Sequence, residues 1–134
     1  MRVSILLVTH NNFGRLLLDT VVDTLGFCPL YTECLTIAQD SDPDAQAERA
    51  RELLAGLPRS SGVLILTDIY GATPCNLALR LQVAEAVRIV SGLNLPMLLR
   101  VFNYPNLDLD ALTEKALSGG RDGVMLVESE QAKP

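Results

Sequence analysis

The sequence predicts an α/β fold, a three-layer sandwich in which helices cover both faces of a mostly parallel four-stranded sheet. The first observation is that two continuous apolar runs, Val3–Thr9 and Val63–Thr67, have the pattern of strands buried on both faces. The second is that strand-like and helix-like segments alternate along the chain, which is typical of a parallel sheet with crossover helices. Right-handed crossovers then place the ends of these two strands on the same edge of the sheet.

In the first half of the chain, a helix and a second strand follow the first apolar run. Apolar residues recur at helical spacing over Phe13–Leu25, and the glycine that follows can close that helix. A short second strand is expected over Leu30–Ile37. The polar connection after it leads to a helix over Asp44–Leu57, which Ser41 or Asp42 can cap.

The second half of the chain alternates in the same way. The strand Val63–Thr67 is followed by a helix from Pro74 to about Ala84, which Thr73 is expected to cap. A short strand over Val87–Val90 leads to a helix over Leu95–Phe102, with the preceding asparagine as its cap.

The last two predicted elements are a helix and a strand. The helix, Leu109–Leu117, is expected to begin at the cap Asp108 and to end at Gly119-Gly120. Val124–Val127 is predicted as a final strand that pairs at an edge, within the subunit or with a neighbour. On this interpretation residues 1–134 form a single domain, because the chain is long enough for one well-formed core but not for two.

Composition and charge exclude several classes of protein. Apolar residues make up 49% of the chain and charged residues 20%, which excludes a disordered protein. The net charge is −5 and no stretch clusters Lys and Arg, so no nucleic-acid partner is expected. No apolar stretch approaches the ~18 residues of a transmembrane helix, and the N-terminus does not resemble a signal peptide. The three scattered cysteines argue against a disulfide framework and fit a reducing cytoplasm.

Two side chains that can do chemistry directly follow the two apolar runs. His10, the one histidine of the chain, ends the run Ile5–His10, and Asp68 comes directly after the second run. Ligands of open parallel sheets bind beyond the carboxyl ends of the strands. A carboxylate bonded to one ring nitrogen fixes the histidine tautomer and leaves the other nitrogen's lone pair as a nucleophile. Taken singly, a solvated histidine or a turn-capping aspartate explains each residue, so the pairing carries the hypothesis.

A loop of small residues and a helix start follow Asp68. The first amides of a helix lack intrahelical acceptors, and the helix dipole favours an anion there. Gly71 and Ala72 allow close approach of the backbone, and the Thr73 hydroxyl can donate a further hydrogen bond. Phosphoryl transfer needs positioning and charge neutralisation, so these residues favour a histidine that accepts a phosphoryl group. The alternative is that Thr73 only caps a helix and Gly71 only forms a turn.

Competing chemistries find less support in the sequence. There is no P-loop, dinucleotide fingerprint, nucleophile elbow or metal-ligand spacing, so neither a cofactor nor a metal is expected. Cys75 lies in the first turn of a predicted helix, where a thiolate is stabilised, and with His10 and Asp68 it offers a hydrolytic Cys-His-Asp set. Its alternative is a small buried side chain, and Cys28 and Cys34 are expected to be packing residues.

Three blocks of sequence are distinctive in their order and spacing. They are Ile5–His10 with Asn12-Phe13, Thr67–Asn76 and Val90–Leu98. On these blocks the chain resembles, over nearly its whole length, the IIA domain of the mannose-type phosphoenolpyruvate-dependent sugar phosphotransferase system.

The resemblance implies a cytoplasmic phosphotransferase component that carries a phosphoryl group in sugar uptake. His10 then accepts the group from the phosphodonor protein phospho-HPr and passes it to a separate IIB-type acceptor, and contact with a membrane occurs only through a permease complex. By motif position, Asp68 holds Nδ1 of the ring and leaves Nε2 to carry the group, which Ala72 and Thr73 bind. The resemblance also implies a homodimer that exchanges the C-terminal strand, Val124–Val127.

The chain departs from the family pattern at several positions. The family commonly has glycine where this chain has Asn11, and Gly-Gly-Ser-Pro-Phe-Asn where this chain has Gly71–Asn76. The threonine keeps a hydroxyl, and Cys75 replaces an apolar residue, which favours packing over catalysis for that thiol. Two alternatives to transport stay open: a regulatory module whose phosphorylation state alters binding to a target protein, and a phosphoryl donor to a dihydroxyacetone kinase.

Overall fold

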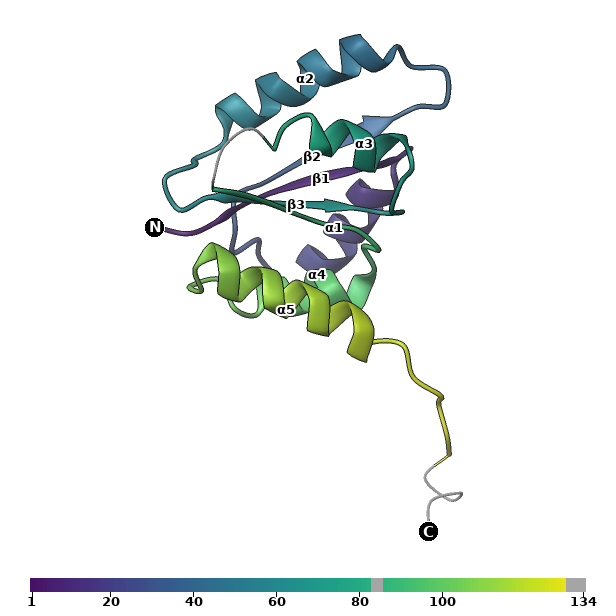
Figure 1. Ribbon diagram of the computed structural model, residues 1–134. Coiled ribbons are helices and arrows are strands. Elements are labelled where there is room, and N and C mark those ends of the chain that lie inside the picture. Colours follow the sequence, from purple (N-terminus) through teal and green to yellow (C-terminus); the bar gives the residue numbers. More distant parts are fainter. Residues whose placement is uncertain (83–85, 130–134) are drawn as a thin grey trace.

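The computed structural model describes residues 1–82 and 86–129, which form a parallel sheet between two layers of helices (Figure 1). The sheet has four parallel strands in the order β2-β1-β3-β4. The strands are β1 (Ser4–His10), β2 (Thr32–Ile37), β3 (Val63–Thr67) and β4 (Val87–Val90). The helices are α1 (Phe13–Leu25), α2 (Pro43–Gly56), α3 (Thr73–Leu79), α4 (Leu95–Phe102) and α5 (Leu109–Asp122). The predicted fold class, an α/β sandwich around a four-stranded parallel sheet, is confirmed.

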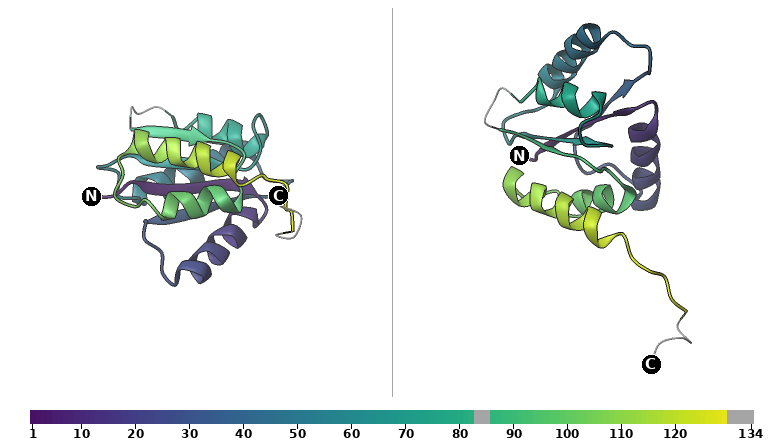
Figure 2. Two further views of the ribbon diagram at one scale, coloured as in Figure 1. Left: turned by 90° about the horizontal axis from the view of Figure 1, so that it is seen from below. Right: turned by 45° about the vertical axis from the view of Figure 1, so that its right-hand side comes forward.

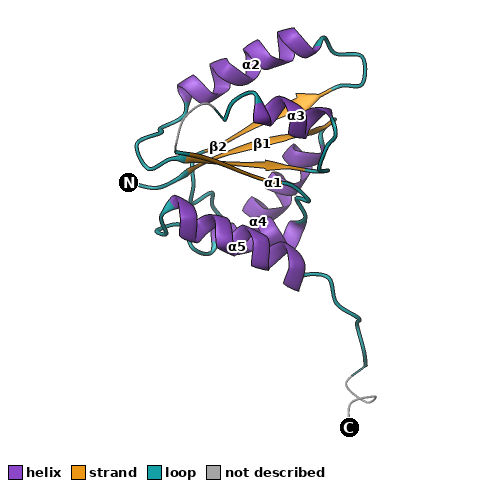
Figure 3. Cartoon of the chain, in the orientation of Figure 1, coloured by secondary structure: helices purple, strands orange, loops and turns teal. Residues whose placement is uncertain are grey.

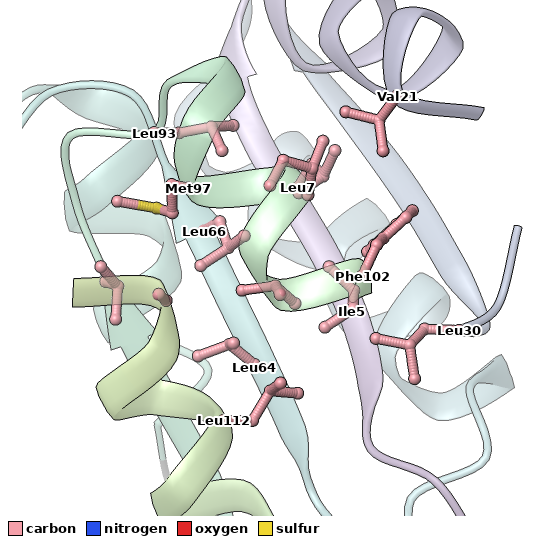
Figure 4. Close-up of a cluster of buried hydrophobic side chains, with 14 of the residues drawn as sticks. Ile5, Leu7, Val21, Leu30, Leu64, Leu66, Leu93, Met97, Phe102 and Leu112 are labelled. Atoms are coloured by element: carbon pink, nitrogen blue, oxygen red, sulfur yellow. The ribbon is translucent and has the colours of Figure 1, made fainter. Parts of the chain in front are cut away.

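Helices cover both faces of the sheet, α2 and α3 on one side and α1, α4 and α5 on the other (Figures 1 and 2). Because successive side chains of a strand point to opposite faces, β1 contributes to two separate cores. Leu6 and Val8 pack in the core under α2 and α3, and Ile5 and Leu7 pack in the other, where Phe102 of α4 also lies (Figure 4). This double burial is the physical reason for the continuous apolar run.

Four helices have a cap that the sequence predicts, and in α5 this cap is Asp108, whose side chain accepts a hydrogen bond from the Ala111 N–H at 2.9 Å. Gly26 follows α1 with φ +84°, a left-handed conformation that glycine adopts without a Cβ clash. Asn94 precedes α4, and its side chain accepts a hydrogen bond from the Met97 N–H at 2.9 Å. Of the two residues expected to cap α2, Asp42 does so by accepting a bond from the third residue of the helix.

Helix α3 is shorter than predicted and has a different cap. Its N-cap is Ala72, whose backbone is extended and whose side chain makes no cap hydrogen bond. Thr73 already has a helical conformation and is the first residue of the helix, so the expectation that it caps α3 is wrong. Pro74 follows in the first turn, where its missing N–H removes no helical bond. The helix ends at Leu79, and the rest of the expected stretch reaches residues 83–85, which lie outside the described part of the chain.

Helix α5 continues through the two glycines that were expected to end it. Gly119 and Gly120 are buried, and α5 extends to Asp122. A Cβ on Gly119 would lie 2.7 Å from the Cβ of Arg100, and one on Gly120 would lie 2.8 Å from the Cε of Met97. The glycines therefore allow α5 to approach α4 closely, and they do not terminate the helix.

The C-terminal segment leaves the body of the molecule as an irregular chain (Figures 1 and 3). Val124–Val127, predicted as a strand, forms none in the single chain, and its side chains are 71–87% exposed. A strand needs a hydrogen-bonding neighbour, and this segment extends away from both edges of the sheet.

No helix in residues 1–82 and 86–129 combines the length and the apolar character that crossing a membrane requires.

Candidate functional site

The parallel register brings His10 and Asp68 to the same edge of the sheet. Val8 of β1 pairs with Thr67 of β3, so the last residue of β1 and the first residue after β3 meet beyond the carboxyl ends of the strands. Nδ1 of His10 lies 2.8 Å from Oδ2 of Asp68. The two central strands of the sheet thus present an imidazole and a carboxylate in direct contact.

Three hydrogen bonds fix the carboxylate of Asp68. Its Oδ2 accepts the backbone N–H of His10 at 2.9 Å as well as the ring nitrogen, and its Oδ1 accepts the N–H of Ile69 at 3.0 Å. The side chain of Asp68 is 9% exposed, whereas that of His10 is 41% exposed. The carboxylate is therefore an oriented, shielded acceptor, and the imidazole beside it is open to solvent.

The electrostatics of the pair define the tautomer of the histidine. Burial raises the pKa of the Asp68 carboxyl, but the hydrogen bonds from the backbone N–H and the ring of His10 outweigh burial and hold that pKa below its ordinary value of 3.8. An ionised carboxylate can only accept hydrogen bonds, so Nδ1 of His10 carries the proton that lies between the two groups. In the neutral ring, which carries one proton, the lone pair of Nε2 is consequently free.

The backbone on either side of His10 is held by specific contacts. The N–H of Asn11 donates to the Ile37 carbonyl of β2 at 3.0 Å, although Asn11 itself lies outside the strand. Its φ of +49° makes Asn11 the one non-glycine residue with positive φ in the part of the chain that the structure describes. On the far side of the turn, Gly14 approaches β1 so closely that a Cβ would lie 3.0 Å from Oγ1 of Thr9.

The three residues expected to bind a phosphoryl group lie in the loop between β3 and α3 and at the first position of α3. Gly71 has φ +79°, a conformation that favours glycine, and its carbonyl accepts a bond from the Asn76 side chain at 3.3 Å. Ala72 precedes the helix, and Thr73 begins it. The structure places Thr73 with His10 around one pocket, whereas Gly71 and Ala72 do not line that pocket.

Two hollows flank His10 with different chemistry. The first, here called the polar pocket, has a volume of about 380 Å³, and its lining includes His10, Asn11, Gln39, Ser41, Pro43 and Thr73. The second, here called the apolar groove, has a volume of about 780 Å³, and its lining includes His10, Phe13, Leu16, Asp68, Ile69 and Leu93.

The site residues that the sequence predicts do not include Gln39 and Ser41 of the polar pocket. They also do not include the apolar residues that line the groove beside His10. A signal was available for the first two, because they follow β2, whose carboxyl end lies at the same edge of the sheet. Phe13 and Leu16 were assigned to a helix face, but they are 41% and 63% exposed and border the groove.

The cysteines lie apart from the histidine. Cys75 is buried and lines neither of the two hollows, which supports packing for this thiol. Burial raises the pKa of the partly buried Cys34 thiol to about 11, as expected of a packing residue. Cys28 is exposed in the loop before β2, so its assignment as a packing residue is wrong. Among residues 1–82 and 86–129, no group of three or more His, Cys, Asp and Glu side chains is placed to hold a metal ion.

Comparison with known proteins gives consistent matches. Over 137 aligned residues the chain is 30% identical to the "PTS system mannose-specific EIIAB component" of Escherichia coli (strain K12), a match that covers 100% of this chain and 41% of that protein. The chain thus spans about two fifths of the length of that relative.

Solved structures with the same fold are similar over nearly the whole chain. The mannose/sorbose specific IIA subunit of the phosphotransferase system from Enterococcus faecalis has a TM-score of 0.88 at 20% identity, covering 99% of this chain and 100% of that one. The phosphotransferase system component EIIA from Streptococcus agalactiae has a TM-score of 0.79 at 23% identity, covering 92% and 95%. At these identities the likeness shows the fold alone.

A family match decides the classification. Residues 4–117 match the EIIA-man family, described as "PTS system fructose IIA component". This range includes both central strands, His10, Asp68 and the loop that leads to α3. The chain therefore belongs to the EIIA-man family of phosphotransferase system (PTS) IIA components.

Proposed function

We propose that this protein is a phosphohistidine carrier of carbohydrate uptake. In this proposal His10 accepts a phosphoryl group from an HPr-type phosphodonor protein and passes it to a IIB-type acceptor. The contact of 2.8 Å between Nδ1 of His10 and Oδ2 of Asp68, in a member of a PTS IIA family, is the observation that carries the proposal.

The chemistry follows from the tautomer. The lone pair of Nε2 attacks the phosphorus of the phosphorylated donor, a bond forms between phosphorus and Nε2, and the bond from phosphorus to the donor breaks with its electron pair left on the donor. The ring then carries a positive charge while Nδ1 keeps its proton. The ionised Asp68 carboxylate offsets that charge, and transfer to the acceptor reverses the same bond changes.

Backbone amides at the start of α3 support binding of the transferred group. The Asn76 N–H donates to the Ala72 carbonyl, so the N–H groups of Thr73 and Cys75 precede the first intrahelical bond. Neither of these two N–H groups donates to another described residue. We propose that Gly71, Ala72 and Thr73 bind the phosphoryl oxygens through the backbone of the loop and the helix start, together with the Thr73 hydroxyl. The Ala72 N–H donates to the Ile69 carbonyl at 3.4 Å, so the free amide among the three that the helix start supplies is that of Thr73.

The apolar groove supports protein partners on both sides of the reaction. Ile69, which lines the groove, is 59% exposed, and the following residue, Tyr70, is 83% exposed. Contiguous exposed apolar surface around a reactive group is typical of a site where another protein docks. A docked protein would also exclude water from the phosphoryl group during transfer.

The C-terminal segment supports assembly into a homodimer. Val124–Val127 presents four exposed apolar side chains on an extended chain, and β4 is an edge strand of the sheet. We propose that this segment adds as a strand to a second copy of the chain, which would bury these side chains and pair the backbone.

Incubation of the purified chain with labelled phosphoenolpyruvate, enzyme I and HPr tests the proposal. The expected result is acid-labile label on His10, no label on His10→Ala, and full label on the control Cys75→Ser, whose thiol lines neither hollow. Label retained by His10→Ala would refute the assignment. Transfer of label from the wild-type chain to a IIB protein separates a transport role from a regulatory one.

A further inference from the structure

A phosphoryl group on His10 would carry a double negative charge beside the ionised Asp68. Neither the polar pocket nor the apolar groove is lined by a lysine or an arginine. The described residues around the histidine therefore offer only neutral donors to the phosphoryl oxygens. Neutral N–H groups bind an oxyanion well when they are oriented toward it and have no other acceptor.

Asn11 has an unusual conformation and an unused side chain. Its φ of +49° lies in the left-handed region, which asparagine adopts more readily than other non-glycine residues and less readily than glycine. The residue lines both hollows beside His10, and among the described residues its hydrogen bond is the backbone one to Ile37, with none from its carboxamide. A strained position next to the reactive group, with a free donor, points to a binding role.

Gln39 provides a second free carboxamide at the polar pocket. It lies two residues beyond Ile37, the β2 residue that pairs with His10 and accepts the Asn11 N–H. It lines the polar pocket together with His10 and Thr73, is exposed, and makes no side-chain hydrogen bond among the described residues. In contrast, the hydroxyl proton of Ser41 is already used, because it donates to the Ala38 carbonyl at 2.6 Å.

We propose that the side-chain amides of Asn11 and Gln39 bind the oxygens of the phosphoryl group on His10 and stabilise the phosphorylated protein. This inference rests on the proposed function of His10 and adds two binding residues outside the loop that leads to α3. A carboxamide N–H₂ donates to a phosphoryl oxygen without a change in net charge, so the site binds the group and still releases it to an acceptor.

The test is the equilibrium constant for phosphoryl exchange between phospho-HPr and this chain, measured from the label in each protein at equilibrium. Asn11→Gly removes one amide and relaxes the backbone, and Gln39→Ala removes the other. Each is expected to lower the constant roughly fivefold, the value of one net hydrogen bond. Asn11→Asp and Gln39→Glu keep the side-chain size but add a like charge, and are expected to lower the constant about tenfold or more.

The matched controls introduce the same charge changes at an asparagine and a glutamine that lie away from the site. Asn103 is the C-cap of α4, Gln46 lies in α2, and neither residue lines a hollow. Asn103→Asp and Gln46→Glu are therefore expected to leave the equilibrium constant within twofold of the wild type. Thermal unfolding of the unphosphorylated variants establishes that each is folded. A constant within twofold of the wild type in either Asn11→Gly or Gln39→Ala overturns the proposed pair. A wild-type chain that takes no label contradicts the proposed function itself, so the two failures are distinguishable.

Discussion

Replacement of Asp68 by asparagine tests how the histidine is activated. An asparagine has one oxygen and one N–H₂ group where the carboxylate has two oxygens, so it cannot accept all three hydrogen bonds of 2.8, 2.9 and 3.0 Å. If the N–H₂ group faces His10, it drives the proton to Nε2 and removes the nucleophilic lone pair. If the oxygen faces His10, the N–H₂ group faces the N–H of Ile69, and the hydrogen bond between these positions is lost because both groups are donors.

The expected size of the effect follows from the bond that is lost. The ring donates to an ionised, shielded carboxylate, and a hydrogen bond to a charged group is worth about 1.5–3 kcal/mol. Asp68→Asn is therefore expected to slow phosphoryl transfer about 10- to 100-fold. Rapid-quench measurement of transfer from labelled phospho-HPr gives the rate. Asp23→Asn, an exposed substitution that removes the same charge on α1, is the control. A rate for Asp68→Asn within twofold of the wild type would refute the role given to this carboxylate.

The same carboxylate gives a pH dependence of stability. Because the pKa of Asp68 is lowered in the folded protein, its contribution to stability is fully present above the ordinary value of 3.8 and is lost as the pH falls through the folded-state pKa. Denaturant unfolding of wild type and Asp68→Asn over that range is expected to show their free energies of unfolding converging on acidification. A difference that stays constant would contradict the linkage.

Three further predictions concern packing, the thiol and assembly. Gly119→Ala is expected to lower the free energy of unfolding by about 1–3 kcal/mol, because the new Cβ would lie 2.7 Å from the Cβ of Arg100. Gly56→Ala is the control and is expected to cost nothing, because a Cβ at that position would meet no atom within 4 Å. Equal losses in the two variants would contradict the close packing of α4 and α5. Cys75→Ser is expected to transfer the phosphoryl group at the wild-type rate in the same quench assay. Loss of transfer would support a catalytic role for the Cys75 thiol. The wild type is expected to sediment as a dimer and Leu126→Asp as a monomer in analytical ultracentrifugation; identical sedimentation would contradict strand exchange.

The sheet and the approach of His10 to Asp68 could be predicted because they depend on local patterns and on a general rule. A strand buried on both faces must be apolar at every position, as β1 is, and parallel strands with crossover helices end at a common edge. The polar residue at each strand end then follows from the order of the sequence alone.

Features that depend on a specific neighbour could not be predicted. Gly119-Gly120 has the signature of a helix end, but its role is set by the distance between α5 and α4. Val124–Val127 has strand character, but a strand requires a partner that the single chain does not provide. The free carboxamides of Asn11 and Gln39 become apparent only when β1 and β2 place them around one pocket.

In the proposed mechanism Asp68 holds Nδ1 of His10 and leaves Nε2 to receive the phosphoryl group. Nitrogen-15 and phosphorus-31 NMR of the phosphorylated chain tests it directly, because a single histidine gives one pair of ring-nitrogen signals. We expect phosphorus coupled to Nε2, with a protonated Nδ1. Phosphorus bonded to Nδ1 would contradict it.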